Sequence, residues 1–147
     1  MIRATMIAAL ALAATASQAQ VNPEGLKWGP APPGLPPGAR LAVLAGNPER
    51  PGPFVIRVRF PAGYVVPPHH HPADEFVTVI SGSMAIGMGD RLRRNRMTAL
   101  REGGFVRARA GMNHYVTTRT GGIVQINSVG PFAIIYANPA DDPRRRR

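Results

Sequence analysis

The chain contains no cysteine, which excludes disulfide bonds, thiolate metal sites, cysteine nucleophiles and iron–sulfur clusters. Aromatic residues make up only 6% of the 147 residues, and no stacking platform for nucleic acid is visible. No heptad run of apolar residues is present, so a coiled coil is also excluded. Gly and Pro are abundant, with 16 of each, and they interrupt long helices while separating short strands. A helix bundle is therefore not expected, and the length fits one domain.

Acidic residues are scarce, because 8 Asp and Glu stand against 18 Lys and Arg, giving a formal net charge of +10. Part of this charge is the run Arg144 to Arg147, which we interpret as part of a disordered basic tail over residues 139–147. We do not expect a nucleic-acid partner, because an exported protein rarely meets one. An anionic ligand or membrane surface that binds the tail stays open as an alternative.

Residues 1–19 have the pattern of a signal peptide. Arg3 provides the positive start, residues 6–16 form a short apolar run, and small residues precede a cleavage site expected after Ala19. The apolar run is shorter than the roughly 20 residues that a membrane span requires. We therefore predict a periplasmic or secreted protein without a membrane span. The alternative is a disordered or anchoring N-terminal helix.

The remaining chain divides into a Pro/Gly-rich extension over residues 20–39, which Trp28 would anchor, and a body over residues 40–138. In the body, residues 54–60 alternate between apolar and other side chains, and a period of two indicates a half-buried strand. Short strands at about ten-residue spacing predict an all-β fold, an antiparallel sandwich or barrel. Residues 91–100 are assigned to a short helix or a loop. The strands are expected at residues 40–44, 54–60, 76–80, 84–88, 105–107, 115–118, 123–127 and 132–136.

Histidine is confined to a triplet and one later residue, His114. Alternation along a strand puts His69 and His71 on one face and His70 on the other. Glu75 follows four residues after His71, so two imidazoles and a carboxylate can form a mixed nitrogen and oxygen site for a divalent metal. His114, on another expected strand, can complete the set. The alternative is a solvated histidine-rich loop that adsorbs metals.

The glycines around these histidines add a more specific pattern. Gly63, His69, His71, Glu75 and Gly82 are spaced as in the first sequence motif of the cupin superfamily, which the segment resembles. A second segment has the spacing of the second cupin motif at Gly103, Gly111 and His114. Arg109 and Thr118 stand where that family usually has Pro and Asn, and neither position is a metal ligand.

The resemblance to a small single-domain bacterial cupin implies an antiparallel jelly-roll β-barrel with one divalent transition metal inside. The metal would be Fe, Mn, Ni, Zn or Cu, and the partners would be a small-molecule ligand and a second copy in a homodimer. His70 is not carried over, and Asp74 has the wrong spacing. The ligands that the resemblance implies are His69, His71, Glu75 and His114.

The function follows less directly, because a fold does not choose a chemistry. One hypothesis is a metal-dependent enzyme of the dioxygenase, isomerase or lyase type that acts on a small oxygen-rich molecule. The second is a non-catalytic ligand-binding or sensor module, which the lack of a further acid or base favours. The third is a basic protein that binds surfaces through its tail. Gln125 and Asn127 can face either the pocket or solvent, and Tyr64 and Tyr115 serve either packing or chemistry.

Overall fold

A computed structural model describes residues 20–145, so the expected signal peptide lies outside the described residues. Within them the chain forms strands and short 3-10 turns and no α-helix. No helix in this range is long and apolar enough to cross a membrane. The 3-10 turns are η1 Pro23–Gly25, η2 Arg94–Arg96, η3 Pro139–Asp141 and η4 Pro143–Arg145. The strands are β1 Gly29–Pro30, β2 Arg40–Ala45, β3 Gly52–Phe60, β4 Val65–His70, β5 Glu75–Met88, β6 Thr98–Arg101, β7 Phe105–Ala108, β8 His114–Thr117, β9 Gly122–Gly130 and β10 Ile135–Tyr136.

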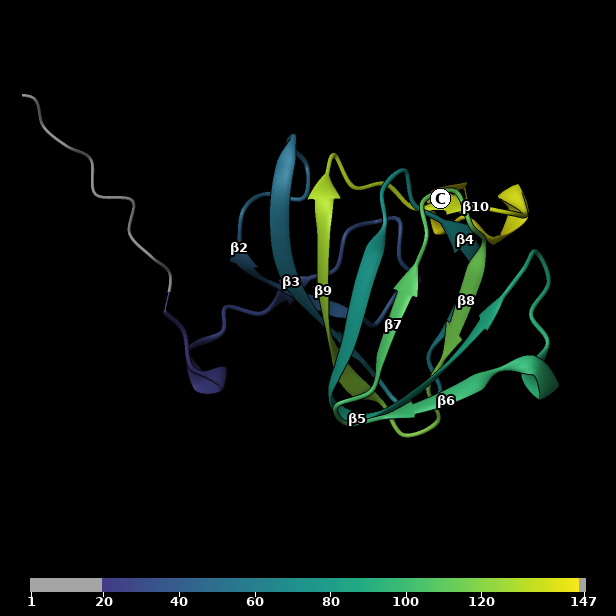
Figure 1. Ribbon diagram of the computed structural model, residues 1–147, viewed down its shortest axis with the longest axis horizontal. Helices are drawn as coiled ribbons and strands as arrows, with labels where there is room; N and C mark the ends of the chain where they lie inside the picture. The colour runs from purple at the N-terminus through teal and green to yellow at the C-terminus, as the bar shows by residue number, and fades with distance from the viewer. Residues whose placement is uncertain (1–19, 146–147) are drawn as a thin grey trace, which may run out of the picture.

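All strand pairs are antiparallel, and together they form one curled sheet in the order β1-β2-β3-β9-β5-β8-β4-β10. The first half of β5 pairs with β9 and β7, and its second half pairs with β6 and β8. Figure 1 shows β3, β9, the first half of β5 and β7 on one side of the barrel and β8, β6 and β4 on the other, and β5 crosses from one side to the other at the lower end. This is the antiparallel jelly-roll barrel expected from the sequence.

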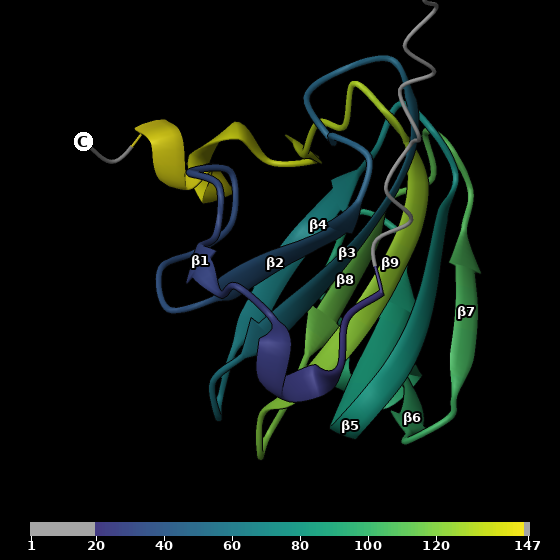
Figure 2. The same ribbon diagram turned by 90° about the vertical axis from the view of Figure 1, so that its left-hand side faces the viewer.

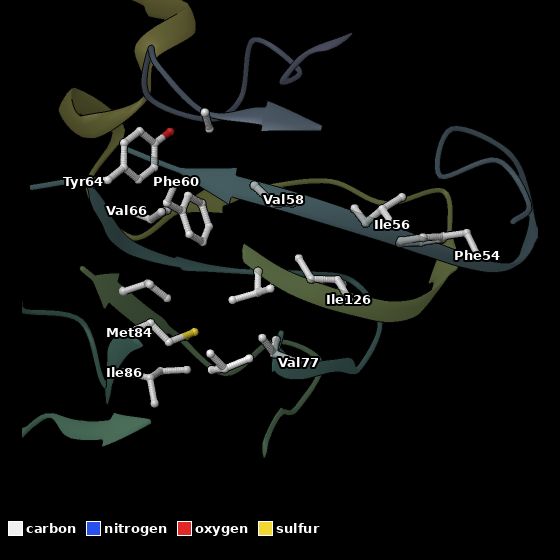
Figure 3. Close-up of a cluster of buried hydrophobic side chains, with 14 residues drawn as sticks. Phe54, Ile56, Val58, Phe60, Tyr64, Val66, Val77, Met84, Ile86 and Ile126 are labelled. Carbon is white, nitrogen blue, oxygen red and sulfur yellow. The ribbon is translucent and has the colours of Figure 1, made fainter. Parts of the chain in front are cut away.

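The barrel interior is apolar because inward-facing side chains from both sides meet there. In β3 the burial alternates as the sequence predicts, with Phe54, Ile56, Val58 and Phe60 buried. Figure 3 shows these side chains beside Ile126 of the neighbouring strand β9 and facing the side chains of the opposite wall, including Met84 and Ile86. Burial of this continuous apolar surface is the main term that stabilises the barrel.

Strand β5 differs from the sequence prediction, which placed two strands on either side of a turn at residues 81–83. The chain continues as one strand, and Gly82 bends it with a φ of +73° and a register shift between Val79 and Ser81. Before the bend the odd residues from Glu75 to Val79 are buried, whereas after it Met84 and Ile86 are. The bend carries the strand from one sheet half to the other while its apolar side chains stay inside.

Other elements also differ from the predicted ones. The segment over residues 91–100 holds the turn η2 and the start of β6, which returns to pair with β5. Strand β10 covers only two residues of the stretch expected at residues 132–136. The stretch before β10 is instead a loop, and this loop reaches the histidines.

From β1 onward the N-terminal extension packs against the barrel, and around Gly34 it meets Ile134 and Arg144 of the C-terminal segment (Figure 2). In the N-terminal extension, β1 pairs with β2, and the guanidinium of Arg59 lies 4.2 Å from the ring centre of Trp28, which anchors this segment. The hydroxyl of Tyr64 donates to the carbonyl of Pro36. The hydroxyl of Tyr136 donates to the carbonyl of Gly34 at 2.8 Å, which ties the extension to the C-terminal segment.

Candidate metal centre

Three strands bring the predicted site residues together. His69 lies in β4 and pairs with His114, the first residue of β8, while Glu75 begins β5. The register of β4 and β8 shifts between Val66 and His69, because β4 has one residue more than its partner there. This bulge contains two prolines, which have no N–H for the ladder. Val66 and His69 therefore both face inward although they are three positions apart, and His71 follows on the same side.

The four side chains converge in the barrel interior. Nitrogen atoms from His69, His71 and His114 lie within 4.8 Å of one another. The Glu75 carboxylate oxygen Oε2 lies 3.6 Å from His71 Nε2 and 3.4 Å from His114 Nε2. All four side chains are buried. The structure thus gathers three imidazoles and one carboxylate around a single point.

Backbone carbonyls fix the protonation of each imidazole. His69 Nδ1 donates to the carbonyl of Pro67 at 2.7 Å, and His71 Nδ1 donates to that of Ala133 at 2.8 Å. His114 Nδ1 lies 3.1 Å from the carbonyl of Met112. A carbonyl only accepts, so Nδ1 must carry the proton, and in the neutral ring Nε2 keeps a lone pair. Each ring therefore presents a metal-binding nitrogen.

The electrostatics favour the neutral form of two of the imidazoles, those of His69 and His71. Burial, followed by the neighbouring histidines, lowers the pKa of His69 to about 3, and burial also lowers the pKa of His71. Burial alone would raise the pKa of Glu75, but the facing histidines, His114 first, hold it below its ordinary value. At neutral pH the rings of His69 and His71 are therefore uncharged beside the buried Glu75 carboxylate.

This arrangement fits a divalent cation. His71 Nε2 and His114 Nε2 are buried without a hydrogen-bond partner, and the oxygen that faces both of them is also an acceptor. A buried carboxylate and two unpartnered buried nitrogens are each costly. A divalent ion between them would satisfy all three atoms, and nitrogen with oxygen donors suits several first-row transition metals.

Two neighbouring residues point elsewhere, as the sequence indicates. His70 Nδ1 lies 2.8 Å from the side-chain oxygen of Asn113, whose amide nitrogen donates to Asp90 at 2.7 Å. Asp74 accepts from the Arg107 side chain and from the backbone N–H of Ala110, both at 2.8 Å. Asp74 thereby holds the loop between β7 and β8 next to the centre, but it does not belong to it.

The centre opens into a cavity of about 670 Å³. Its walls near the histidines are apolar, with Val77, Val116 and Ile126 among the lining side chains. Its outer part is lined by the Pro-rich extension, the loop after β2, and the C-terminal segment that includes Arg144. The volume suits a small organic molecule.

Several residues at the centre have no signal in the sequence. The ring of Phe132 stacks on His71 with centres 4.2 Å apart and planes at 17°, and it meets Phe54 edge-on at 5.2 Å. The neighbouring Ala133 supplies the carbonyl that orients His71. Tyr136 packs beside His69 with ring centres 5.9 Å apart. These contacts depend on where the C-terminal loop packs, and no residue spacing reveals that.

The structure also decides the pocket residues that the sequence left open. In β9, Val124 and Ile126 face inward, so Gln125 and Asn127 lie on the outer face. Gln125 accepts from the Arg57 guanidinium there at 3.2 Å. Tyr115 is buried with 1% exposure and donates to the carbonyl of Arg93, so it packs and does not line the cavity.

Comparisons with known proteins agree on the fold. The polyketide cyclase RemF from Streptomyces resistomycificus superposes with a TM-score of 0.69 at 17% identity, over 84% of this chain and 88% of that one. An RmlC-like cupin from Shewanella frigidimarina gives a TM-score of 0.58 at 18% identity, over 76% and 90% of the two chains. The DMSP lyase DddQ from Ruegeria pomeroyi gives 0.60 at 20% identity, over 76% and 60%.

The comparison with curated proteins gave no match. Among protein families, the one described as "Cupin domain" matches residues 56–130, which contain the four converging side chains and most of the barrel strands. With the jelly-roll barrel and the structural neighbours, this match shows that the chain belongs to the cupin family.

Proposed function

We propose that this cupin is an exported metal-dependent enzyme that acts on a small oxygen-rich molecule in its barrel cavity. One observation carries the proposal. The buried nitrogens His71 Nε2 and His114 Nε2 face the ionised Glu75 carboxylate, and neither has a hydrogen-bond partner among the described residues. In this proposal one divalent transition metal is held by His69, His71, Glu75 and His114.

The metal would supply Lewis-acid chemistry, or oxygen chemistry if it is redox-active, and the donor set suits Fe, Mn, Ni, Zn or Cu. The chain itself orients the metal ligands and surrounds them with apolar side chains. The carbonyls of Pro67, Ala133 and Met112 hold the rings, and the apolar lining limits competing water near the centre. These features support dioxygenase, isomerase and lyase types of reaction.

The structural neighbours do not choose among these reactions. One is named a polyketide cyclase and another a DMSP lyase, although both share this barrel at identities near 20% or below. A shared fold at such low sequence identity does not identify the substrate of this chain. The reaction type therefore has to come from the metal and from the cavity of this chain.

A non-catalytic binding or sensor module is the alternative, and one observation favours it. Among the cavity-lining side chains of residues 20–145, the titratable ones outside the four proposed ligands are Glu49 and Arg144, and both are exposed. The inner cavity thus offers no separate general acid or base. Turnover would then depend on Glu75 or on a metal-bound hydroxide.

Metal analysis tests the proposal. The full chain, a His69→Ala/His71→Ala variant and a His70→Ala control are purified and their bound metals are quantified. We expect about one equivalent in the wild type and the control, and none in the double variant, because His70 bonds to Asn113 outside the cavity. Wild-type protein that holds no metal, even after reconstitution, would contradict the proposal.

Turnover separates the enzyme from the binding module. The metal-loaded protein is assayed with diketones, flavonols, sugar acids and hydroxy acids, with and without chelator. Product that disappears on chelation and returns with one metal supports the enzyme. Ligand-induced thermal stabilisation without product supports the binding module.

Export and a homodimer remain proposals that rest on the sequence. Mass spectrometry of the protein from fractionated cells should give a chain that begins at Gln20 if cleavage follows Ala19. Light scattering after size-exclusion chromatography should give twice the mass of one chain. An intact N-terminus inside the cell, or a monomer at micromolar concentration, would remove the corresponding part.

A further inference from the structure

The C-terminal segment connects the metal centre to a cation at the cavity mouth. The carbonyls of two consecutive residues in this segment each accept a hydrogen bond. Ala133 accepts from His71 Nδ1 at 2.8 Å, and Ile134 accepts from Arg144 Nη2 at 2.9 Å. Both His71 and Arg144 line the same cavity. The segment that orients one proposed metal ligand therefore also positions an arginine side chain over the same space.

The Arg144 guanidinium is held in one orientation. Its Nε donates to Asp142 Oδ1 at 2.7 Å and its Nη2 donates to Asp142 Oδ2 at 2.8 Å. The hydrogen bonds that Arg144 donates to Asp142 also raise the pKa of Arg144, so the group stays cationic. A planar guanidinium with one edge fixed in this way can offer its remaining donors to a second carboxylate.

The remaining donor of this guanidinium faces a glycine. Nη1 has no hydrogen bond or ion pair to the described residues, and it would lie 3.7 Å from a Cβ at Gly34. Gly34 has no side chain to cover the group, and 45% of the Arg144 side chain is exposed. A bound ligand that extends from the cavity to its mouth can therefore contact Nη1 of Arg144.

The rest of the lining defines what such a ligand looks like. The polar side chains of the cavity lining form two groups, the buried proposed metal ligands and the exposed Asn47, Glu49 and Arg144. Because the second group is exposed, we place it at the mouth. Apolar walls separate the two groups. A bound molecule needs an oxygen donor at one end, an apolar middle, and a group that suits the mouth at the other.

Two side chains of opposite charge, Glu49 and Arg144, could bind the outer end of the ligand. Glu49 lies on the loop after β2 and is exposed, and no hydrogen bond restrains its carboxylate among residues 20–145. Arg144 is fixed by three side-chain hydrogen bonds before any ligand arrives. A preorganised group loses less conformational entropy on binding, so the arginine gains more from a ligand of opposite charge.

We propose that Arg144 determines specificity by binding the carboxylate of small organic acids whose other end reaches the metal centre. This inference rests on the proposed function, because the metal anchors the inner end of the ligand. It narrows the substrate class from oxygen-rich molecules in general to amphiphilic acids with an apolar body. Asp142 acts as a positioning residue for the guanidinium.

The test uses probes that share one metal-binding end. The monohydroxamates of adipic, suberic and sebacic acid are compared with their methyl esters and with ω-amino hydroxamates of similar length. Each is titrated by calorimetry into metal-loaded wild type, Arg144→Gln, Arg144→Lys and Arg145→Gln. Arg145 is the matched control, because it lies in the same turn but does not line the cavity.

We expect the acid to bind about threefold to tenfold more tightly than its ester for at least one chain length, as a partly exposed charged hydrogen bond allows. Arg144→Gln should remove this preference while the ester affinity and the bound metal stay unchanged. Arg144→Lys should retain part of it, and Arg145→Gln all of it. Thermal melts confirm that each variant is folded.

The outcomes separate the two proposals. Equal binding of acid and ester, a preference that survives Arg144→Gln, or tighter binding of the amine would overturn the role of Arg144, the last by assigning the mouth to Glu49. If metal-loaded protein binds no probe, the inference fails and the metal centre stands. If the protein holds no metal, both fail together.

Discussion

Gly87 is the position where a single added methyl group should disturb the barrel and the candidate site together. It lies in β5 directly opposite Tyr115 of β8. A Cβ at Gly87 would come closer than 3.0 Å to the ring carbons and the hydroxyl of Tyr115. The ring cannot move aside, because it is 1% exposed and its hydroxyl donates to the carbonyl of Arg93 at 3.3 Å.

Gly87→Ala should therefore lower the free energy of unfolding by about 2 kcal/mol, the usual cost of overpacking a full core. For a chain of this length that corresponds to a decrease in Tm of roughly 6–10 °C. Because β8 also carries His114 next to Tyr115, its displacement should weaken metal retention as well. Urea denaturation followed by circular dichroism, with metal analysis on the same samples, measures both effects.

A double-mutant cycle tests whether the ring is the cause. Tyr115→Ala alone should cost about 3–5 kcal/mol through the cavity it leaves. In Gly87→Ala/Tyr115→Ala the overlap no longer exists, so the double variant should lose about 2 kcal/mol less than the sum of the single variants. Additivity within about 0.5 kcal/mol would refute the reasoning. Gly29→Ala is the control, because its Cβ would meet only the Leu41 carbonyl at 3.9 Å.

Three further predictions concern the core and the centre. Phe54→Ala should cost about 3–5 kcal/mol by urea denaturation because Phe54 is 1% exposed, whereas Phe105→Ala, at 57% exposure, should cost less than about 1 kcal/mol. Phe132→Ala should raise the dissociation constant of the metal, measured by chelator competition, because it removes the ring that stacks on His71; an unchanged constant would assign that ring to packing alone. Metal at about a hundredfold excess over its dissociation constant should stabilise the protein by about 2.7 kcal/mol, and a scanning-calorimetry melt unchanged by chelator would contradict a bound ion.

The sequence predicts features that depend on neighbouring residues in one strand. The period of two in β3 assigns its buried face correctly, and the same parity places His69 and His71 together while His70 points away. Parity fails where a strand bends. Residues on either side of Gly82 form one strand in two sheet halves, whereas the sequence predicts two strands there because Ser-Gly-Ser resembles a turn. A positive φ serves a bend as well as a turn, so composition alone does not distinguish them.

The sequence does not predict what approaches from distant segments. The sides of Gln125 and Asn127 follow from the register of β9 with β3 and β5, which is set by packing across the sheet. The carbonyl of Ala133 and the ring of Phe132 reach His71 because a loop about sixty residues later in the chain packs over it. Neither residue type is unusual for a loop, so neither gives a signal.

The contrast between inner and outer cavity explains which part of the function a sequence motif can carry. Three of the proposed ligands lie in strands of the barrel, and His71 directly follows β4. Gly111, with a φ of +72°, donates to the His71 carbonyl at 2.9 Å in the turn before His114. Changing such a position disturbs the barrel and the centre together.

The mouth of the cavity is instead built by the extension and the C-terminal segment, which lie outside residues 56–130 and meet through Tyr136 and Gly34. Because these segments contribute little to strand pairing, they can change without unfolding the barrel. We therefore expect substrate choice to depend on the segments that carry no cupin motif. In them, Arg144 has a charged group held in place that can select a substrate.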